Sequence, residues 1–415
     1  MTTSGSFNIS LGSTATAQFQ LRPEQIQGVH IPPAPLTDLI AQIKQALEKP
    51  PGFPALRSCV VPGDRVCIVI DDELLHADLF VHEIINILRE SHVESKDITV
   101  LSRTSLLPGH TSKITESHPE ISLTSHMQLG KKIEEDHCAY LASSADGQRI
   151  YLSRPVVEAD FVISCGLMTY HQQTGYRTTS TLIFPELSDD QALARYQTWS
   201  IDELNPEDDR HWRQLASEVD WLIGSPFSIQ AIPSSVGGVT EITAGQTEQT
   251  FAALRPQMDD GWRFSLPERV ETVIAIVDLD EKDVTFSHVA QALKNARKLV
   301  QREGKIILVT QLNAPLTDRL ELLRQHDTPY EGFQTLRKLP ARQEASHALI
   351  FADAVDWANV YLTSRLPSET VEDLFMTPIQ DNAELQRLLD AHPDDSTAVL
   401  IGAQYLWTEI ADGEK

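Results

Sequence analysis

The chain has 415 residues, with 34 Lys and Arg against 59 Asp and Glu, a formal net charge of −25 and a hydrophobic content of 41%. That content excludes simple disorder, and the length predicts two or three domains. The acidic balance repels phosphate backbones and anionic lipid, so we expect no nucleic-acid or membrane partner and favour small molecules or proteins.

No apolar run reaches the ~20 residues of a membrane span, and the first residues lack the basic and apolar regions of a secretion signal. We therefore expect a soluble, cytoplasmic protein. The four cysteines are far apart and form no CxxC pair, which argues against a disulfide framework or a zinc knuckle.

The first half of the chain alternates predicted strands and helices. Residues 7–26 read as one or two short strands, and Thr37 and Asp38 are placed to cap a helix with apolar residues at helical spacing. The β-branched run ending at Asp71 and Asp72, a helix over 79–90 and a strand over 97–103 form a strand, helix, strand unit. Further elements are a strand over 160–166, preceded by a hairpin-like segment over 144–155, and helical character over 186–222.

The pattern restarts after a Gly- and Ser-rich connection at 233–245. Strand, helix and strand are predicted over 271–280, 284–301 and 304–312. Helices, one more strand and a last strand over 397–407 follow. We predict an α/β fold of two α/β domains with mostly parallel sheets and an interdomain cleft, residues 1–255 forming the larger domain and 256–415 the smaller.

Polar residues follow the predicted buried strands, where open α/β sheets place their ligands. Asp71 and Asp72 are placed to take a proton or bind a cation, and equally to cap the next helix. His171 is a candidate general acid or base, and Arg177 could hold a carboxylate or lie on the surface. The fourteen histidines show no HExxH or other strong metal spacing and the glycines no GxGxxG, so we predict neither a metal site made by the protein alone nor a Rossmann nucleotide site.

Most of the chain resembles, in order and with the same spacings, the lactate racemase family of nickel-pincer-nucleotide enzymes. The resemblance runs through residues 30–73, DITVLSR at 97–103, VEADFVISCGLMTYHQQTGYRTTSTLIFP at 157–185 and GKIILVT at 304–310. It implies two α/β domains with the site between them. It also implies interconversion of 2-hydroxy acid stereoisomers by hydride transfer to a nickel-carrying, pyridinium-derived cofactor.

On the substrate side the family pattern is kept only in part. Asp72 matches the family's acid, but Leu75 stands where an arginine binds the substrate carboxylate, and Leu107 stands where a catalytic histidine belongs unless His110 takes its place. His171 matches the second acid/base histidine. The resemblance makes His171 and Asp72 the catalytic candidates, and Arg177, Tyr176, His110 and His288 the substrate-binding candidates. The family's Tyr-Gln-x-x-Lys matches residues 287–291, where Gln291 takes the lysine position, and a shift of this alignment by one turn brings in Lys294.

On the cofactor side the positions match but the residues differ. Thr178, Thr179 and Thr181 occupy the cofactor site, and Thr181 replaces the lysine that tethers the nucleotide. Gln197 stands at the position of the nickel-coordinating histidine and is a poor ligand for such a metal. Loss of several cooperating groups predicts no ordinary lactate racemisation.

Three hypotheses follow. The chain is a divergent racemase or epimerase with a noncovalent cofactor, a cofactor-free isomerase or lyase in which Asp72 and His171 exchange protons, or a noncatalytic relative that binds a small acid or a partner protein. The expected ligand is a small hydroxy acid, and a homo-oligomer is possible on this pattern.

Overall fold

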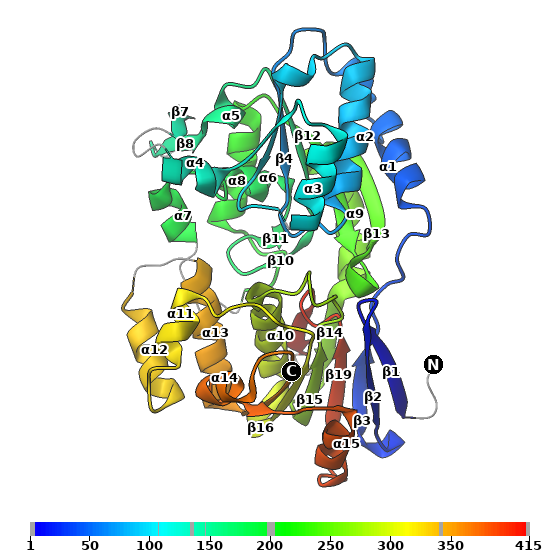
Figure 1. Ribbon diagram of the computed structural model, residues 1–415, viewed down its shortest axis with the longest axis vertical. Helices are drawn as coiled ribbons and strands as arrows, with labels where there is room; N and C mark the ends of the chain where they lie inside the picture. The colour runs from blue at the N-terminus through cyan, green and yellow to red at the C-terminus, as the bar shows by residue number, and fades with distance from the viewer. Residues whose placement is uncertain are drawn as a thin grey trace.

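The computed structural model describes residues 5–106, 108–132, 137–145, 147–196, 204–339 and 343–411. Two six-stranded sheets, each covered by helices, lie one above the other in the long molecule of Figure 1. The predicted class, α/β with mostly parallel sheets, is confirmed. Within the described ranges, no helix is long and apolar enough to cross a membrane.

The first sheet has the strand order β13-β12-β9-β4-β5-β6, in which only the β12–β13 pair is antiparallel. Its strands are β4 (Val66–Ile70), β5 (Ile98–Ser102), β6 (Ser122–Ser125), β9 (Phe161–Leu167), β12 (Phe227–Pro233) and β13 (Val239–Gln246). All five residues of β4 are buried. This is the burial expected of a β-branched strand covered on both faces.

Helices cover both faces of this sheet because each presents an apolar stripe to it. One face packs on α1 (Leu39–Glu48) and α2 (Ala77–Glu90), with α3 (Pro108–Ser117) beside them, and the other on α6 (Thr179–Ile183), α8 (His211–Leu222) and α9 (Thr247–Trp262). The predicted cap is confirmed, since the Asp38 carboxylate accepts the Ala41 N–H at 3.0 Å. Smaller elements are α4 (His126–Lys132), β7 (Cys138–Ser143), β8 (Arg149–Ser153), α5 (Arg154–Val157), β10 (Thr169–His171), β11 (Gly175–Arg177) and α7 (Asp190–Tyr196).

The second sheet is wholly parallel and has the order β18-β17-β16-β15-β19-β3. Its strands are β3 (Ile26–His30), β15 (Val270–Ile276), β16 (Val300–Val309), β17 (Asn359–Thr363), β18 (Thr377–Pro378) and β19 (Thr397–Ile401). One face packs on α10 (Phe286–Leu299) and α13 (Gln343–Trp357), and the other on the hairpin β1 (Ser6–Leu11), β2 (Ala15–Gln20) and on α15 (Asn382–Asp390). The remaining elements are β14 (Arg263–Leu266), α11 (Asp318–Leu323), α12 (Pro329–Arg337), α14 (Ser368–Asp373) and β20 (Trp407–Ile410).

Three local interpretations of the sequence are corrected by the structure. Half of the Gly- and Ser-rich connection is strand β13, and residues 255–262 lie inside α9, which continues through Pro256. The last strand is two strands, because Gly402 adopts a φ of +70° and turns the chain between β19 and β20. The division of the chain into two domains at residue 255 stays a prediction. The structure adds that β1, β2 and β3, at the start of the chain, pack with the second sheet.

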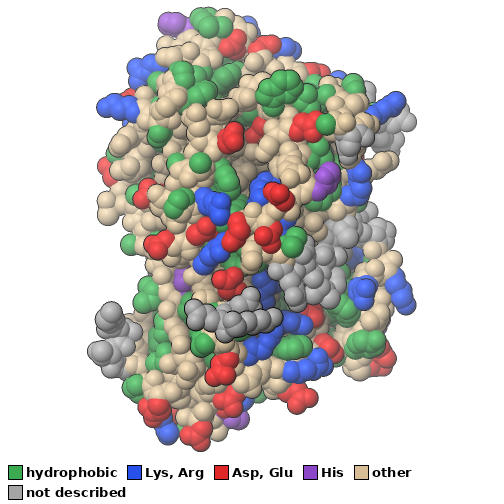
Figure 2. Space-filling model, turned by 180° about the vertical axis from the view of Figure 1, so that it is seen from behind, with side chains coloured by type: hydrophobic (Ala, Val, Ile, Leu, Met, Phe, Trp, Pro, Cys, Tyr) green, Lys and Arg blue, Asp and Glu red, His purple; other side chains and the backbone are tan. Residues whose placement is uncertain are grey.

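The net negative charge is not gathered into one patch on the face seen in Figure 2. Acidic and basic side chains lie side by side across the middle of that face. Many of these charges are paired, as in the bidentate bond from Arg65 to Asp160, with N–O distances of 3.0 Å.

Candidate functional site

A pocket of about 970 Å³, counted out to where it opens to solvent, lies between the two sheets. The first half contributes the segments after β4, β5 and β9, and the second half contributes α10, α13 and the turn after β19. Its polar lining comprises Glu73, Arg103, Thr169, His171, Gln172, Gln173, Arg177, Glu186, Ser287, His288, Gln291, Lys294, Ser346, His347 and Gln404. The location agrees with the rule that parallel sheets place ligands at the carboxyl ends of their strands.

Arg177 forms one wall of the pocket, but buried carboxylates occupy its guanidinium. Nη1 and Nη2 donate to Asp71 at 2.6 and 2.9 Å, and Nε and Nη2 donate to Glu186 at 2.8 and 3.1 Å. The three side chains are at most 8% exposed. These two bidentate ion pairs leave Arg177 little capacity to bind a substrate carboxylate, so the geometry favours a structural role for this residue.

Of the acids that follow β4, Glu73 lines the pocket, and Asp72 does not. The Asp72 carboxylate accepts hydrogen bonds from the backbone N–H and the hydroxyl of Thr104, at the end of β5. Glu73 faces the second half, where Ser287 Oγ lies 3.5 Å from its Oε1. Burial raises the pKa of Glu73 to about 7, and the neighbouring carboxylates add to that effect while Arg177 opposes it.

His171 lines the opposite side of the pocket and is held in one orientation. Its Nδ1 accepts from the Gln173 N–H at 3.2 Å and from the Tyr196 hydroxyl at 3.1 Å, and its ring stacks on Tyr196. Burial, with Lys294 and nearby arginines, lowers the pKa of His171 to about 3. The neutral ring therefore carries its hydrogen on Nε2 and offers a donor, because Nδ1 is already an acceptor.

His288 has the same tautomer for a different reason. It stands at the third position of α10 and accepts the Thr285 N–H on Nδ1 at 3.1 Å, completing a capping box with that threonine. Its Nε2 is buried and finds no partner among the described residues. Because burial lowers the pKa of His288 to about 4, the ring is neutral and this Nε2–H is an unused donor in the pocket wall.

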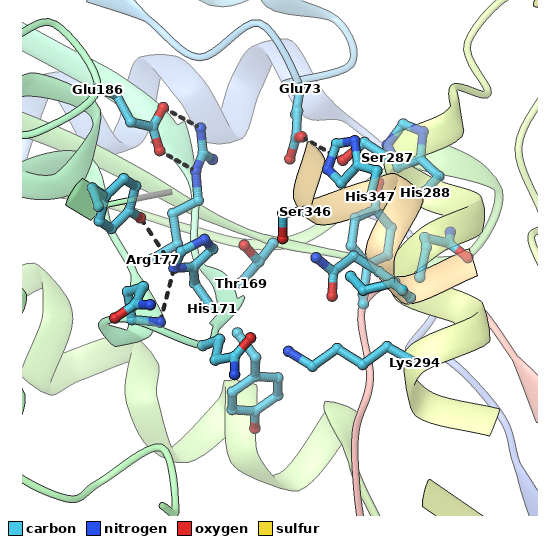
Figure 3. A pocket seen from close by; sticks show the side chains of 18 of the residues that line it. Glu73, Thr169, His171, Arg177, Glu186, Ser287, His288, Lys294, Ser346 and His347 are labelled. Atoms are coloured by element: carbon cyan, nitrogen blue, oxygen red, sulfur yellow. Dashed lines mark hydrogen bonds and ion pairs between the residues drawn. The ribbon is translucent and has the colours of Figure 1, made fainter. Parts of the chain in front are cut away.

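Lys294 and His347 complete the second half of the pocket. Figure 3 shows Lys294 extending from α10 toward the middle of the pocket, below Glu73 and opposite His171. Burial, with the nearby charges of Lys298 and Arg210, lowers the pKa of Lys294 to about 7. Burial likewise lowers the pKa of His347 to about 4. Within the described ranges the Lys294 amine makes no hydrogen bond or ion pair, so a ligand can use it.

Two predicted substrate-binding residues lie outside this pocket. The hydroxyl of Tyr176 donates to Asp259 at 2.8 Å and its ring is buried in the core of the second half. His110 Nδ1 lies 2.5 Å from an oxygen of Asp78, between α3 and α2. Neither side chain contributes to the pocket lining.

The threonines predicted for the cofactor site begin helix α6 and also lie outside this pocket. Thr181 is fully buried, donates to the Thr178 carbonyl at 2.7 Å and accepts the Thr178 N–H at 3.0 Å. Thr179 bonds Ser228 at 2.7 Å. Thr178 and Thr181 border a separate surface pocket with Asp220 and Trp221. Gln197 falls outside the described residues.

Three functional residues were missed or left as alternatives by sequence reasoning. Glu73 was not among the predicted site residues, which included its neighbour Asp72, yet it is Glu73 that lines the pocket. Lys294 depended on a one-turn shift of the alignment, and it lines the pocket together with His288. His347 lies in an apolar helix and gave no signal.

Comparison with known proteins extends these observations. The family model described as the lactate racemase N-terminal domain matches residues 12–206. The lactate racemase apoprotein from Thermoanaerobacterium thermosaccharolyticum has a similar structure, with a TM-score of 0.75 at 14% identity over 97% of this chain and 100% of that one. A protein from Thermotoga maritima reaches 0.66 at 11% identity over 92% and 100% of the two chains. Identities this low establish the fold alone. No curated protein matches the chain by sequence.

Proposed function

The chain carries a lactate racemase N-terminal domain and belongs to the family that this domain defines, and on that premise we propose that its pocket is a proton-transfer site for a small 2-hydroxy acid. In this proposal the protein is an isomerase of the racemase or epimerase type. It works without a covalently tethered cofactor.

The observation that carries the proposal is the pairing of Glu73 and Lys294 across one pocket. They come from opposite halves of the molecule, and the pKa of each lies at about 7. A general acid or base works best when its pKa is close to the working pH. Two such groups on opposite walls can remove a proton from one face of a carbon and return one to the other face.

The substrate carboxylate is assigned to the two histidines. His171 and His288 each present an Nε2–H to the pocket, and the second has no partner within the described residues. Neutral donors fixed in a recessed site stabilise an anion without having to reorganise. When C2 of the acid loses its proton, charge moves onto the carboxylate oxygens, where these donors lie.

The residues present do not fit the tethered nickel-pincer nucleotide that the resemblance implies. Thr181 carries no amine, and its hydroxyl is used twice within the capping box of α6. The segment also faces away from the pocket that holds His171 and Lys294. We therefore derive no step through that cofactor.

The test follows exchange of the C2 hydrogen of D- and L-2-hydroxy acids in D2O by proton NMR, using chelator-treated protein without added cofactor. The wild type is expected to exchange and interconvert both stereoisomers. Glu73→Gln and Lys294→Met each remove the proton-transferring group on one side of the pocket, so each should stop interconversion of the stereoisomers. Exchange of the C2 hydrogen should then survive for one stereoisomer only. Glu73→Gln should keep exchange for one stereoisomer, and Lys294→Met should keep it for the other. Glu83→Gln is the matched control, because Glu83 is a buried acid of α2 that pairs with Lys44 and does not line the pocket.

A second candidate is binding of a small acid without turnover. The donors that line the pocket favour it, since the His288 Nε2–H has no partner within the described residues and the Lys294 amine lies in the same pocket. Calorimetric binding of a hydroxy acid that is weakened by Lys294→Met, with no C2 exchange in the wild type, would select this function over the isomerase.

A further inference from the structure

A second cluster of chemically active side chains lies in the first half, at the start of α4 and of β7. His126, His137 and Cys138 come from two segments that the fold brings together. One nitrogen of each ring and the Cys138 sulfur all lie within 4.8 Å of one another. Two imidazoles and a thiol are a ligand set that zinc prefers.

The hydrogen bonding of His126 prepares it to bind a metal. Its Nε2 lies 2.9 Å from the Ser188 carbonyl, which can only accept, so Nε2 carries the hydrogen and Nδ1 keeps a lone pair. The side chain is 3% exposed, and Nδ1 is buried without a partner within the described ranges. A backbone carbonyl on the far nitrogen is the usual support of a zinc-bound histidine.

We propose that His126, His137 and Cys138 form a zinc site whose fourth position is open to water. His137 lines a cavity of about 820 Å³, counted out to its open side, bordered by residues such as Arg154 and Glu158. That cavity gives the ion a route to the site and a place for a bound water. Three protein ligands and a water are the arrangement of zinc sites that stay exchangeable.

The distances require a small contraction on binding. Zinc holds nitrogen and sulfur ligands at ~2.0–2.3 Å, so in a tetrahedron they lie roughly 3.3–3.7 Å apart, about 1 Å closer than the widest spacing here. The rings of His126 and His137 lie 4.9 Å apart between centroids and are tilted by 57°. Side-chain rotation of His137, which is half-buried, can supply that movement.

Nearby charged residues both favour and oppose the binding of a cation at this cluster. Asp189 and Asp190 lie close enough to Cys138 to interact with it electrostatically, and their negative charge attracts a cation. Arg103 lies close enough to His126 to oppose added positive charge. The balance favours a site that binds zinc reversibly through its lone pairs and thiolate, with release of the thiol proton on binding.

The experiment titrates chelator-treated full-length protein with Co²⁺ and then displaces it with Zn²⁺. The expected result is one Co²⁺ per chain, with a thiolate-to-cobalt charge-transfer band that zinc removes. Cys138→Ser should abolish the band, and His137→Asn should weaken Co²⁺ binding at least tenfold. Circular dichroism checks that both variants fold.

Two matched controls locate the site. Cys59→Ser removes another half-buried thiol, and His118→Asn removes one member of a separate histidine pair with His82. Both should bind Co²⁺ as the wild type does. The proposal is overturned if the wild type gives no charge-transfer band, if Cys138→Ser keeps it, or if either control loses it.

Discussion

Replacing Arg177 by methionine should be among the most damaging single changes in the first half. The substitution keeps a long side chain but removes the positive charge that joins Asp71 at the end of β4 to Glu186 after α6. Both carboxylates are buried, with side chains 0% and 6% exposed. They would then face each other without the cation between them.

The expected cost follows from that burial. Breaking a buried ion pair by removing one partner costs roughly 3–5 kcal/mol, because the remaining charge is left uncompensated. Here one cation serves two carboxylates, while backbone N–H groups of Glu73 and Leu167 still donate to Asp71 and limit the loss. We therefore expect about 3–5 kcal/mol, a large share of the ~5–15 kcal/mol that stabilises a typical protein.

Urea denaturation followed by fluorescence and circular dichroism measures this loss. A shift of the midpoint at unchanged slope reports stability, and if the two halves unfold separately the shift belongs to one transition only. Arg65→Met is the control, because Arg65 makes a similar fork to Asp160 but the two side chains are 59% and 45% exposed. Solvent screens an exposed pair, so Arg65→Met should shift the midpoint far less than Arg177→Met. Equal losses for the two variants would refute the argument.

Three more predictions concern the pocket and its support. The rate of C2 exchange should peak near pH 7, because Glu73 is a carboxylate above its pKa of about 7 and Lys294 is an ammonium below its pKa of about 7. The fall in rate at alkaline pH comes from deprotonation of Lys294, so the pH–rate profile of Lys294→Met should lack that fall. Tyr196→Phe removes the hydroxyl bonded to His171 Nδ1 and should cost roughly 1 kcal/mol in thermal unfolding. Gly166→Ala would place a Cβ 2.5 Å from the side chain of Leu182, so calorimetry should show a loss of roughly 1–3 kcal/mol. Gly109→Ala is the control and should not lower stability, because Gly109 lies in α3 with open space around its Cβ and without a positive φ.

The sequence predicted the elements of the fold well because local pattern dominates there. The buried β4, the capped α1 and the restart of the pattern at β15 all follow from apolar periodicity and capping residues. Sequence reasoning failed where the pairing of strands far apart in the chain determines the fold. Strand β3 joins the second sheet across more than 360 residues of chain, through its pairing with β19, and no local pattern can signal that.

The candidate site was predicted less well, since it depends on the direction of individual side chains. Asp72 and Glu73 are adjacent in sequence, yet one bonds Thr104 while the other faces the pocket. His171 was identified from its place after a strand and His288 from the family resemblance, and both line the pocket. Their protonation state could not be predicted, because it is set by burial and by the groups that donate to Nδ1.

The scaffold and the site have therefore diverged to different degrees. The parallel sheets still direct their carboxyl ends at one pocket, since that depends on topology and on apolar patterns that tolerate many substitutions. The segment from Thr178 to Thr181 forms the cap of α6, in which the Thr181 hydroxyl accepts from the Thr178 N–H and donates to the Thr178 carbonyl. A lysine at position 181 would lose that cap. In the proposed function, proton transfer therefore rests on Glu73, Lys294 and the two neutral histidines, all of which line the pocket.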